Sequence, residues 1–246
     1  MNLKVINTGS KGNCYILSNE HEALIIEAGV NSKKIMKAID FEVSNVKACL
    51  VTHEHKDHSL AAEVLTTKGI DVYSTPGTFQ ALELNTYRAK KIKTETTYKA
   101  GNFKFRAYKV EHDANEPVCF EIYHADIGKI VFITDTSKCK YIFENVDHFL
   151  IEANFDEKAL FDKDNEDPLF LTDRISKNHL SIQRAMTYVK NHDYKRLKNI
   201  ILIHLSNRNS DMFTFEQMFY NKLGLHTLIA QNGESYNLKE NSQIPF

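Results

Sequence analysis

Short apolar runs alternate with polar turns along the whole chain, and this pattern predicts a mixed succession of strands and helices. Strands are predicted at residues 3–8, 14–18, 23–27, 48–51, 72–73, 103–110, 118–123, 130–134, 149–151 and 200–205. Helices are predicted at residues 32–40, 59–69 and 78–84. Two more are expected, one capped by Ser181 and one that opens with a capping box of Thr214 and Gln217 and stops at Gly224.

Strands and helices mix in both halves of the sequence, and no linker divides them. We therefore predict one α/β domain over residues 1–246, with two sheets packed together and helices outside, a four-layer αββα sandwich. Residues 157–177 are the exception, because acidic and apolar side chains are interspersed there. Two interpretations stay open for this segment: a solvated surface insertion, or a lid or dimerisation segment beside the site.

Composition narrows the class of protein. Nine Gly and four Pro among 246 residues argue against a disordered or linker-dominated chain. The sequence contains no run of 18 apolar residues, so it predicts no membrane span. Its first residues predict a strand and not a signal peptide. The four cysteines, Cys14, Cys49, Cys119 and Cys139, form no CxxC pair, so we expect reduced thiols in a cytoplasmic protein.

Charge and histidine content point in different directions. The formal net charge is −1, with 31 Lys and Arg against 32 Asp and Glu, which argues against a grip on long nucleic acid by bulk electrostatics. Lys90, Lys91 and Lys93 form a short basic stretch. The favoured interpretation is that these side chains lie on a solvated face and do not contact nucleic acid. Eleven histidines, in contrast, are concentrated in a way that predicts chemistry.

The strongest motif follows the predicted strand 48–51 directly. His53, His55, Asp57 and His58 place three imidazoles and a carboxylate within six residues. A loop at the end of a buried strand lets such side chains converge on metal ions. Solvated histidines are the bland alternative, and a chance occurrence of HxHxDH is rare at this histidine frequency.

Three later polar residues each end an apolar run. His112 follows the predicted strand 103–110, and Asp135 follows the predicted strand 130–134. His204 lies near the end of the predicted strand 200–205. Each taken alone is equally well explained as a satisfied polar group at a strand end. Together with the HxHxDH motif they complete a seven-ligand set for two metal ions.

With these residues the sequence resembles the metallo-β-lactamase superfamily over nearly its whole length. Within it, the chain is similar to the YycJ/WalJ-like and RNase Z-related phosphodiesterase branch, through the stretches TGSKGNC (8–14), IEAN (151–154), NHLS (178–181) and HLS (204–206). The chain is also similar to phage anti-Pycsar cyclic-nucleotide phosphodiesterases of that branch.

The resemblance implies a ligand set and a homodimer. By it, His53, His55 and His112 bind one metal, Asp57, His58 and His204 bind the other, and Asp135 bridges both. Zn²⁺ is the expected ion, with Mn²⁺ possible at a site that contains carboxylates.

A phosphodiesterase mechanism follows from this set. A metal-bridging hydroxide attacks phosphorus, and His179, oriented by Glu152, protonates the leaving oxygen, while Asp57 is both ligand and catalytic residue. We expect Ser206, Asn207 and Arg208 to bind the substrate phosphate, because they follow His204 directly. Glu27 stands where the branch usually has an aspartate, which puts the local geometry in doubt.

Three functions remain open. The favoured substrate is a cyclic mononucleotide, because the net charge is near zero and the chain is compact. The alternative is a YycJ-like DNA exonuclease. A metal-stabilised interaction module without catalysis is the least favoured, since every expected ligand is present together with Glu152 and His179.

Overall fold

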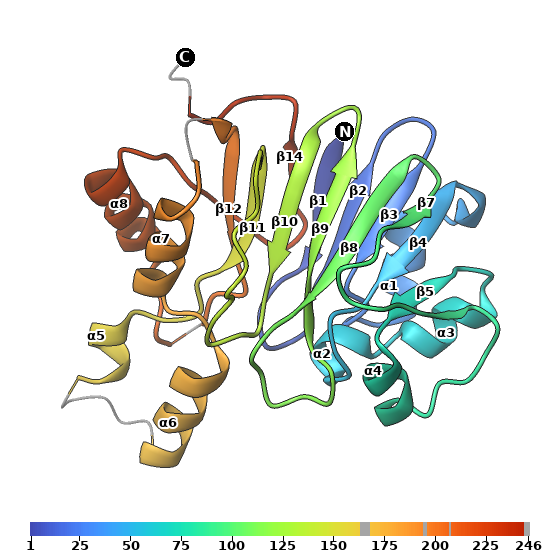
Figure 1. Cartoon of the computed structure of the whole chain (residues 1–246), viewed down its shortest axis with the longest axis horizontal. Helices are drawn as coiled ribbons and strands as arrows, with labels where there is room; N and C mark the ends of the chain where they lie inside the picture. The colour runs from blue at the N-terminus through green and yellow to red at the C-terminus, as the bar shows by residue number, and fades with distance from the viewer. Residues whose placement is uncertain (163–167, 194–195, 207, 244–246) are drawn as a thin grey trace. The chain divides into compact units, whose positions relative to one another are not determined.

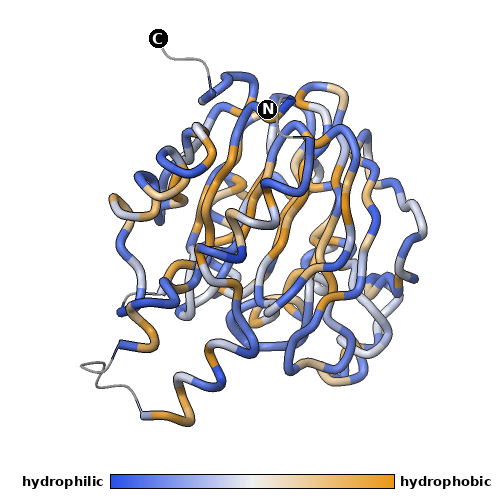
Figure 2. Tube along the Cα trace, turned by 60° about the vertical axis from the view of Figure 1, so that its left-hand side comes forward, coloured by the Kyte–Doolittle hydropathy of each residue, from blue (hydrophilic) through white to orange (hydrophobic). Residues whose placement is uncertain are grey.

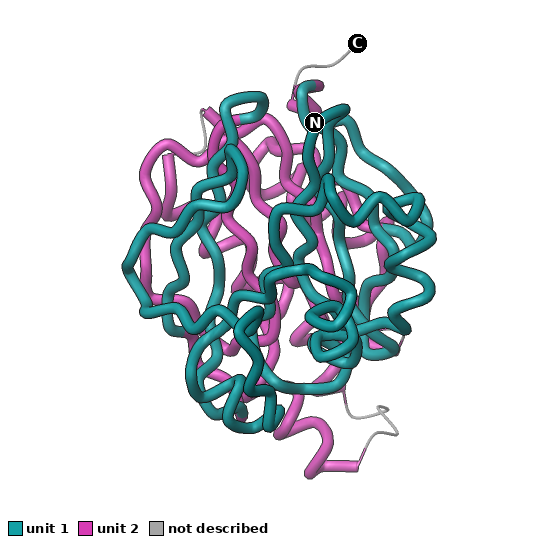
Figure 3. The backbone as a smooth tube through the Cα atoms, turned by 90° about the vertical axis from the view of Figure 1, so that its right-hand side faces the viewer, with its two compact units in different colours: residues 1–109, 114–127, 231–239 teal, residues 110–113, 128–230, 240–246 magenta. Residues whose placement is uncertain are grey.

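The computed structural model describes residues 1–162, 168–193, 196–206 and 208–243. They form two compact units, each built from separate stretches of chain (Figure 3). Unit 1 comprises residues 1–109, 114–127 and 231–239, and unit 2 comprises residues 110–113, 128–230 and 240–246. Most elements of both units are labelled in Figure 1.

Unit 1 contains a seven-stranded mixed sheet in the order β14-β1-β2-β3-β4-β5-β6. Its strands are β1 (Asn2–Asn7), β2 (Cys14–Ser18), β3 (Ala23–Ile26), β4 (Val46–Leu50), β5 (Val72–Ser74), β6 (Ala89–Lys91) and β14 (Ser235–Asn237). The strands β14, β1, β2 and β3 pair antiparallel, and β3 to β6 pair parallel. The strands predicted at residues 3–8, 14–18, 23–27, 48–51 and 72–73 are thus confirmed to within two residues.

One face of this sheet is covered by short helices. They are α1 (Ser32–Ala38), the 3-10 helix η1 (Val43–Asn45), α2 (Lys56–Ser59), α3 (Ala62–Thr67) and α4 (Pro76–Ala81). Ile35 of α1 and Leu65 of α3 pack with Ile25 and Cys49 of the strands in one buried cluster. The single helix predicted over 59–69 is wrong in detail, because the chain forms two helices separated at Leu60 and Ala61.

The opposite face of the sheet packs on an antiparallel hairpin extended by one strand. This part comprises β7 (Tyr98–Ala100), β8 (Phe103–Lys109) and β9 (Val118–His124). The rings of Tyr73 on β5 and Phe105 on β8 meet edge to face, with centroids 5.1 Å apart. Residues on β8 alternate between buried and exposed or half-buried, which is the periodicity that predicted this strand.

Unit 2 is built on four parallel strands in the order β13-β12-β11-β10. These are β10 (Gly128–Ile133), β11 (His148–Glu152), β12 (Asn199–Ile203) and β13 (Leu228–Ile229). All residues of β11 and β12 are buried, as in a parallel sheet covered on both faces. In Figure 2, hydrophobic residues are frequent along the extended stretches of the trace, whereas hydrophilic residues are frequent in the segments that connect them.

Four helices complete the described part of unit 2. They are α5 (Glu157–Leu160), α6 (Leu169–Asn178), α7 (Ile182–Lys190) and α8 (Met212–Leu223). Ser181 caps α7 as predicted, since its side chain accepts from the Arg184 amide. The capping box predicted for α8 is wrong: Asp211 caps this helix by accepting from the Thr214 amide, because the helix begins earlier, at Met212. Gly224 ends α8 with φ 66°, as expected.

The segment predicted as an insertion, 157–177, contains α5 and most of α6, and its residues 163–167 lie outside the described part. All four cysteines lie among the described residues, and each is a buried thiol outside any disulfide bond. Among the described residues, no helix combines the length and the apolar character that crossing a membrane requires.

Candidate active site

Unit 1 carries four of the predicted ligands after β4, with His53 and His55 on the loop that leaves this strand and Asp57 and His58 in α2. The imidazole rings of His53 and His58 have centroids 4.3 Å apart, and those of His53 and His55 are 4.7 Å apart. Asp57 Oδ2 lies 3.5 Å from His58 Nε2. His53 and His58 are buried, so these imidazoles are held in a fixed arrangement beside one carboxylate.

Close backbone packing fixes the shape of this loop. A side chain at Gly29 would meet the carbonyl oxygen of Asp57 at 1.7 Å, so only glycine fits there. Gly12, at φ +128°, packs against Gly29 with equally little space. The turn 8–14 of the sequence motif is therefore a support for the ligand loop.

Asn13 connects that turn to the ligands and was not predicted to have a role. Its amide N–H donates to the Asp57 carbonyl at 2.7 Å, and its side-chain Nδ2 lies 3.2 Å from His58 Nε2. Its Oδ1 accepts from the Gly9 amide at 2.9 Å. From the other side, Glu54 Oε1 accepts from the Asn115 amide at 2.7 Å. These hydrogen bonds hold the ligand segment in place through both Asp57 and Glu54.

Glu27, the residue that departs from the usual aspartate, lies beside His58. It has φ 65°, in the left-handed region, directly after β3. Glu27 Oε1 is 3.5 Å from His58 Nδ1, and Oε2 accepts from the Thr52 amide at 3.4 Å. Burial raises the pKa of Glu27, and the neighbouring His58 opposes that rise. The glutamate side chain, which is longer than that of the usual aspartate, therefore still lies beside the His58 imidazole that it would orient.

Unit 2 gathers its predicted residues at the carboxyl ends of adjacent parallel strands. Asp135 follows β10, Glu152 closes β11, and His204 follows β12. Asp135 at φ 43° and His204 at φ 54° adopt the left-handed backbone that non-glycine residues rarely take. Strain of this kind is concentrated at functional sites, where the surrounding structure enforces it.

Glu152 lies at the centre of this group. Its Oε1 accepts from His179 Nδ1 at 2.8 Å and from His204 Nδ1 at 2.9 Å. Its Oε2 accepts from the backbone amides of Leu180 at 3.0 Å and Thr136 at 3.3 Å. A single fully buried carboxylate therefore fixes two imidazoles, each of which keeps its Nε2 directed away from Glu152. The sequence paired Glu152 with His179 alone.

The charges of this group shift its proton equilibria. Burial acts to raise the pKa of Glu152, but the positive charge of His179 and the hydrogen bonds from both imidazoles outweigh it, so that pKa is lowered. Burial acts to lower the pKa of His179, but the charge and hydrogen bond of Glu152 prevail, so that pKa is raised. His179 therefore keeps its proton to higher pH than a free histidine does.

His112 belongs to the same unit. Its Nδ1 donates to the Asn178 carbonyl at 3.1 Å, and its Nε2 lies 3.8 Å from Asp135 Oδ2. Ligand atoms of Asp135, Glu152, His179 and His204 all lie within 4.8 Å of one another. Because Glu152 is already occupied by four N–H donors, Asp135 and His204 are the residues of this group suited to a divalent metal.

The expected phosphate-binding residues lie in the loop after β12. Ser206 Oγ accepts from the Arg208 and Asn209 amides, both at 3.3 Å, so it shapes the loop itself. Arg208 is exposed, and Asn207 lies outside the described residues. Asn154 was also missed as a site residue: its Nδ2 donates to the His204 carbonyl at 3.0 Å. Its position in the IEAN stretch was the available signal.

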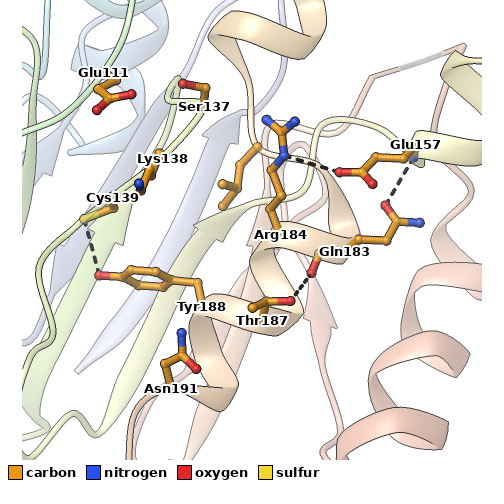
Figure 4. Close-up of a pocket in the computed structure, with 11 residues that line it drawn as sticks. Glu111, Ser137, Lys138, Cys139, Glu157, Gln183, Arg184, Thr187, Tyr188 and Asn191 are labelled. Carbon is orange, nitrogen blue, oxygen red and sulfur yellow. Dashed lines mark hydrogen bonds and ion pairs between the residues drawn. The ribbon is translucent and has the colours of Figure 1, made fainter.

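A pocket of about 600 Å³ is lined by residues close in sequence to Asp135 and His179 (Figure 4). It is lined by Ser137, two residues after Asp135, and by Leu180, next to His179. Arg184 on its wall pairs with Glu157 at 3.3 Å, and the Tyr188 hydroxyl lies 3.3 Å from Cys139 Sγ. Lys138 lines the same pocket and is exposed.

Comparisons with known proteins show the family to which this chain belongs. The family described as "Beta-lactamase superfamily domain" matches residues 29–205. Exodeoxyribonuclease WalJ of Streptococcus pneumoniae serotype 2 is 31% identical over 223 residues, which cover 84% of this chain and 82% of the relative. Exodeoxyribonuclease YycJ of Bacillus anthracis is 28% identical over 176 residues, 65% of each chain.

Solved structures show the same fold at low identity. YhfI of Bacillus subtilis, a metallo-β-lactamase fold protein, has a TM-score of 0.74 and 17% identity, covering 96% of this chain and 98% of its own. The short form of human tRNase Z has a TM-score of 0.66 and 16% identity, covering 97% and 99%. The chain therefore belongs to the metallo-β-lactamase superfamily of metal-dependent hydrolases, homologous to YycJ and WalJ.

Proposed function

We propose that this chain is a binuclear metal-dependent phosphodiesterase that acts on DNA. The observation that carries the proposal is the pair of imidazoles, His179 and His204, held by the one buried carboxylate of Glu152. Such an arrangement provides a metal ligand and a proton donor from the same anchor. The names of the relatives WalJ and YycJ support DNA as the substrate.

The donor set suits divalent ions of intermediate softness, and Zn²⁺ is our first choice, with Mn²⁺ as the alternative. We propose that His53, His55 and His112 hold one ion, that Asp57, His58 and His204 hold the other, and that Asp135 contacts both. When bound, two such ions supply an acidified water and neutralise charge on the phosphoryl oxygens. Asn13 and Glu27 orient His58, and Asn154 orients the backbone of His204.

His179 acts as the general acid in this proposal. Its Nδ1–H donates to Glu152, which fixes the tautomer and raises its pKa, so Nε2 carries the proton to be given to the leaving oxygen. Phosphodiesters expel a poor alkoxide leaving group, so this proton transfer matters. Ser206, Asn207 and Arg208 are proposed to bind the phosphate.

DNA takes precedence here over the cyclic mononucleotide favoured by net charge. A curated relative at 31% identity over most of both chains is named for DNA, whereas net charge is a weak discriminator between substrates. The cyclic substrate remains the second candidate, because the −1 net charge still favours a small ligand.

One assay separates the candidates. Metal-loaded protein is offered end-labelled single- and double-stranded DNA and, separately, cyclic mononucleotides. We expect progressive shortening of DNA from an end. Hydrolysis of cyclic mononucleotides with DNA left intact would overturn the DNA proposal, and no turnover of either with both ions bound would overturn catalysis itself.

The general acid is tested by His179→Ala, with His21→Ala as a control at an exposed histidine. We expect His179→Ala to keep its metal content and to lose about 10²–10⁴-fold in turnover of DNA. The loss should be much smaller on a diester with a nitrophenolate leaving group, which needs no protonation. Equal losses on both diesters would contradict the assignment.

We also propose that the chain works in the cytoplasm as a homodimer. Four buried thiols outside any disulfide bond suit a reducing compartment. Phe161, Leu169 and Phe170 in unit 2 are 59%, 88% and 76% exposed, and exposed large apolar side chains are typical of an interface. Sedimentation velocity should report a dimer, and Phe170→Glu should shift it to monomer; a wild-type monomer at micromolar concentration would contradict the proposal.

A further inference from the structure

An exposed aromatic ring lies among cations at the edge strand β6 of unit 1, on residues that the proposed chemistry does not use. The Tyr87 side chain is 76% exposed. The Arg88 guanidinium carbon lies 4.8 Å from the centre of this ring, and Lys90 Nζ lies 5.5 Å from it. Both distances are within the range of cation–π attraction, so the ring and the two cations form one group.

One acidic side chain organises the cations of this group. Asp71 Oδ1 accepts from Arg88 Nη1 at 2.7 Å, and Asp71 Oδ2 is 3.7 Å from Lys90 Nζ. Asp71 neutralises one of the two positive charges, and Lys68 and Lys91 nearby are both exposed. The Arg88 guanidinium carries five N–H donors, and its bond to Asp71 uses one of them. The group therefore combines a preformed geometry with excess positive charge.

A hollow of about 510 Å³ adjoins the ring. It is lined by Tyr87 and Arg88 on one side and by the end of α3 with the following turn, residues 66–69, on the other. α3 and β5 pack together in unit 1 (Figure 1). This volume is in the range of pockets that hold small ligands. An unstacked base with its phosphate is of suitable size, whereas a paired base in a duplex offers no free face to the ring.

The geometry points to a binding surface for single-stranded DNA at Tyr87, Arg88 and Lys90, separate from the residues proposed for catalysis. A base stacks on the exposed ring of Tyr87, and the adjacent phosphate contacts Arg88 and Lys90. Stacking tolerates any base, so the surface is sequence-independent. This inference differs from the interpretation of the basic stretch as a solvated face, and it rests on the proposed function only for the choice of DNA as the strand.

The test is binding of a fluorescent phosphorothioate oligothymidylate of about ten nucleotides to the metal-loaded full chain, followed by anisotropy. We expect Tyr87→Ala to weaken binding about tenfold and Tyr87→Phe to retain it, because the ring supplies the stack. Lys90→Gln should reduce the slope of log K against log salt by about 0.7, the value for one phosphate contact on a single strand.

Tyr123→Ala is the matched control. Tyr123 is also exposed, at 44%, and has Lys104 Nζ 6.0 Å from its ring centre, but it does not line that hollow. Equal losses for Tyr87→Ala and Tyr123→Ala, or no loss for Tyr87→Ala, would overturn the inference.

Hydrolysis of bis(p-nitrophenyl) phosphate, measured alongside, separates this result from the proposed function. All four variants, Tyr87→Ala, Tyr87→Phe, Lys90→Gln and Tyr123→Ala, should leave that hydrolysis unchanged. A chain that binds the oligonucleotide through Tyr87 but hydrolyses no diester would refute the proposed chemistry and support the surface. A Tyr87→Ala variant that loses small-diester hydrolysis as well would refute a separate surface.

Discussion

At the scale of single residues, the backbone conformation and the hydrogen bonds of Glu152 decide what the site can do. Glu27, Asp135 and His204 adopt left-handed backbone at the ends of their strands. Such a conformation costs on the order of 1–2 kcal/mol for a residue with a Cβ, so the packing around it must compensate. Glu152 adds a fixed anion that both aligns and charges His179.

Glu152→Gln tests this role directly. The amide of Gln would present an N–H to at least one group that now donates to Glu152, so the two imidazoles lose their common acceptor. We expect turnover to fall at least 10²-fold and metal affinity to fall about 10–100-fold, as for other groups that orient a ligand histidine. Metal content by mass spectrometry and turnover are measured together. Unchanged metal affinity with reduced turnover would mean that Glu152 acts through His179 alone.

At the scale of elements, a buried carboxylate in the β2–β3 turn joins the seven-stranded sheet of unit 1 to the strands β7, β8 and β9. Glu22 Oε1 accepts from Asn102 Nδ2 at 2.7 Å, and Oε2 accepts from the Asn102 amide at 2.9 Å in the β7–β8 turn. His124 Nε2, at the end of β9, lies 3.2 Å from Oε1. Burial acts to raise the pKa of Glu22, but the hydrogen bonds from Asn102 and His124 outweigh it and lower that pKa.

This contact predicts a pH-dependent stability. Because the folded pKa lies below the unfolded one, the ionised carboxylate stabilises fully above the unfolded pKa, and that stabilisation is lost as pH falls through the folded pKa. We expect Glu22→Gln to lower the free energy of unfolding by about 1–2 kcal/mol at pH 7. The difference from wild type should shrink below about pH 4.

Urea unfolding at several pH values measures this difference. Glu20→Gln, an exposed neighbour in the same turn, is the control and should change little. A difference for Glu22→Gln that stays constant down to pH 3 would contradict the role of its ionised carboxylate.

At the scale of the whole molecule, the chain passes between the two units five times, after residues 109, 113, 127, 230 and 239. Neither unit is a continuous stretch of chain. Strand β14 completes the sheet of unit 1 only after nearly all of unit 2 has been traversed. Unit 2 takes residues 110–113, with the proposed metal ligand His112, from the middle of unit 1.

We therefore propose that residues 1–246 unfold as one cooperative domain. Differential scanning calorimetry should give a single transition, with the calorimetric enthalpy equal to the van't Hoff enthalpy. Hydrogen exchange of β1 and of β12 should report the same global opening free energy. Two separate transitions, or a large difference between these strands, would refute a single domain.

The sequence by itself determined the strands, the superfamily and the ligand motif, because these depend on local order. A period of two in β8, continuous apolar runs in β11 and β12, and HxHxDH directly after β4 are each visible within a few residues. The resemblance then supplied the partners of the motif. The shorter elements β6, β7, β13, β14 and α5 escaped prediction, because two to four residues carry too little periodicity.

Only the tertiary structure decided the interactions between distant residues. Glu152 meets His179 and His204, 27 and 52 residues away, because parallel strands and the helix starts that follow bring their ends to one edge. Asp211, not Thr214, caps α8, and the helix expected over 59–69 divides in two. Tyr87, Arg88 and Lys90 form one group beside a hollow only because the fold brings the end of α3 next to the residues before β6, since stacking and charge depend on side-chain positions that a linear pattern does not contain.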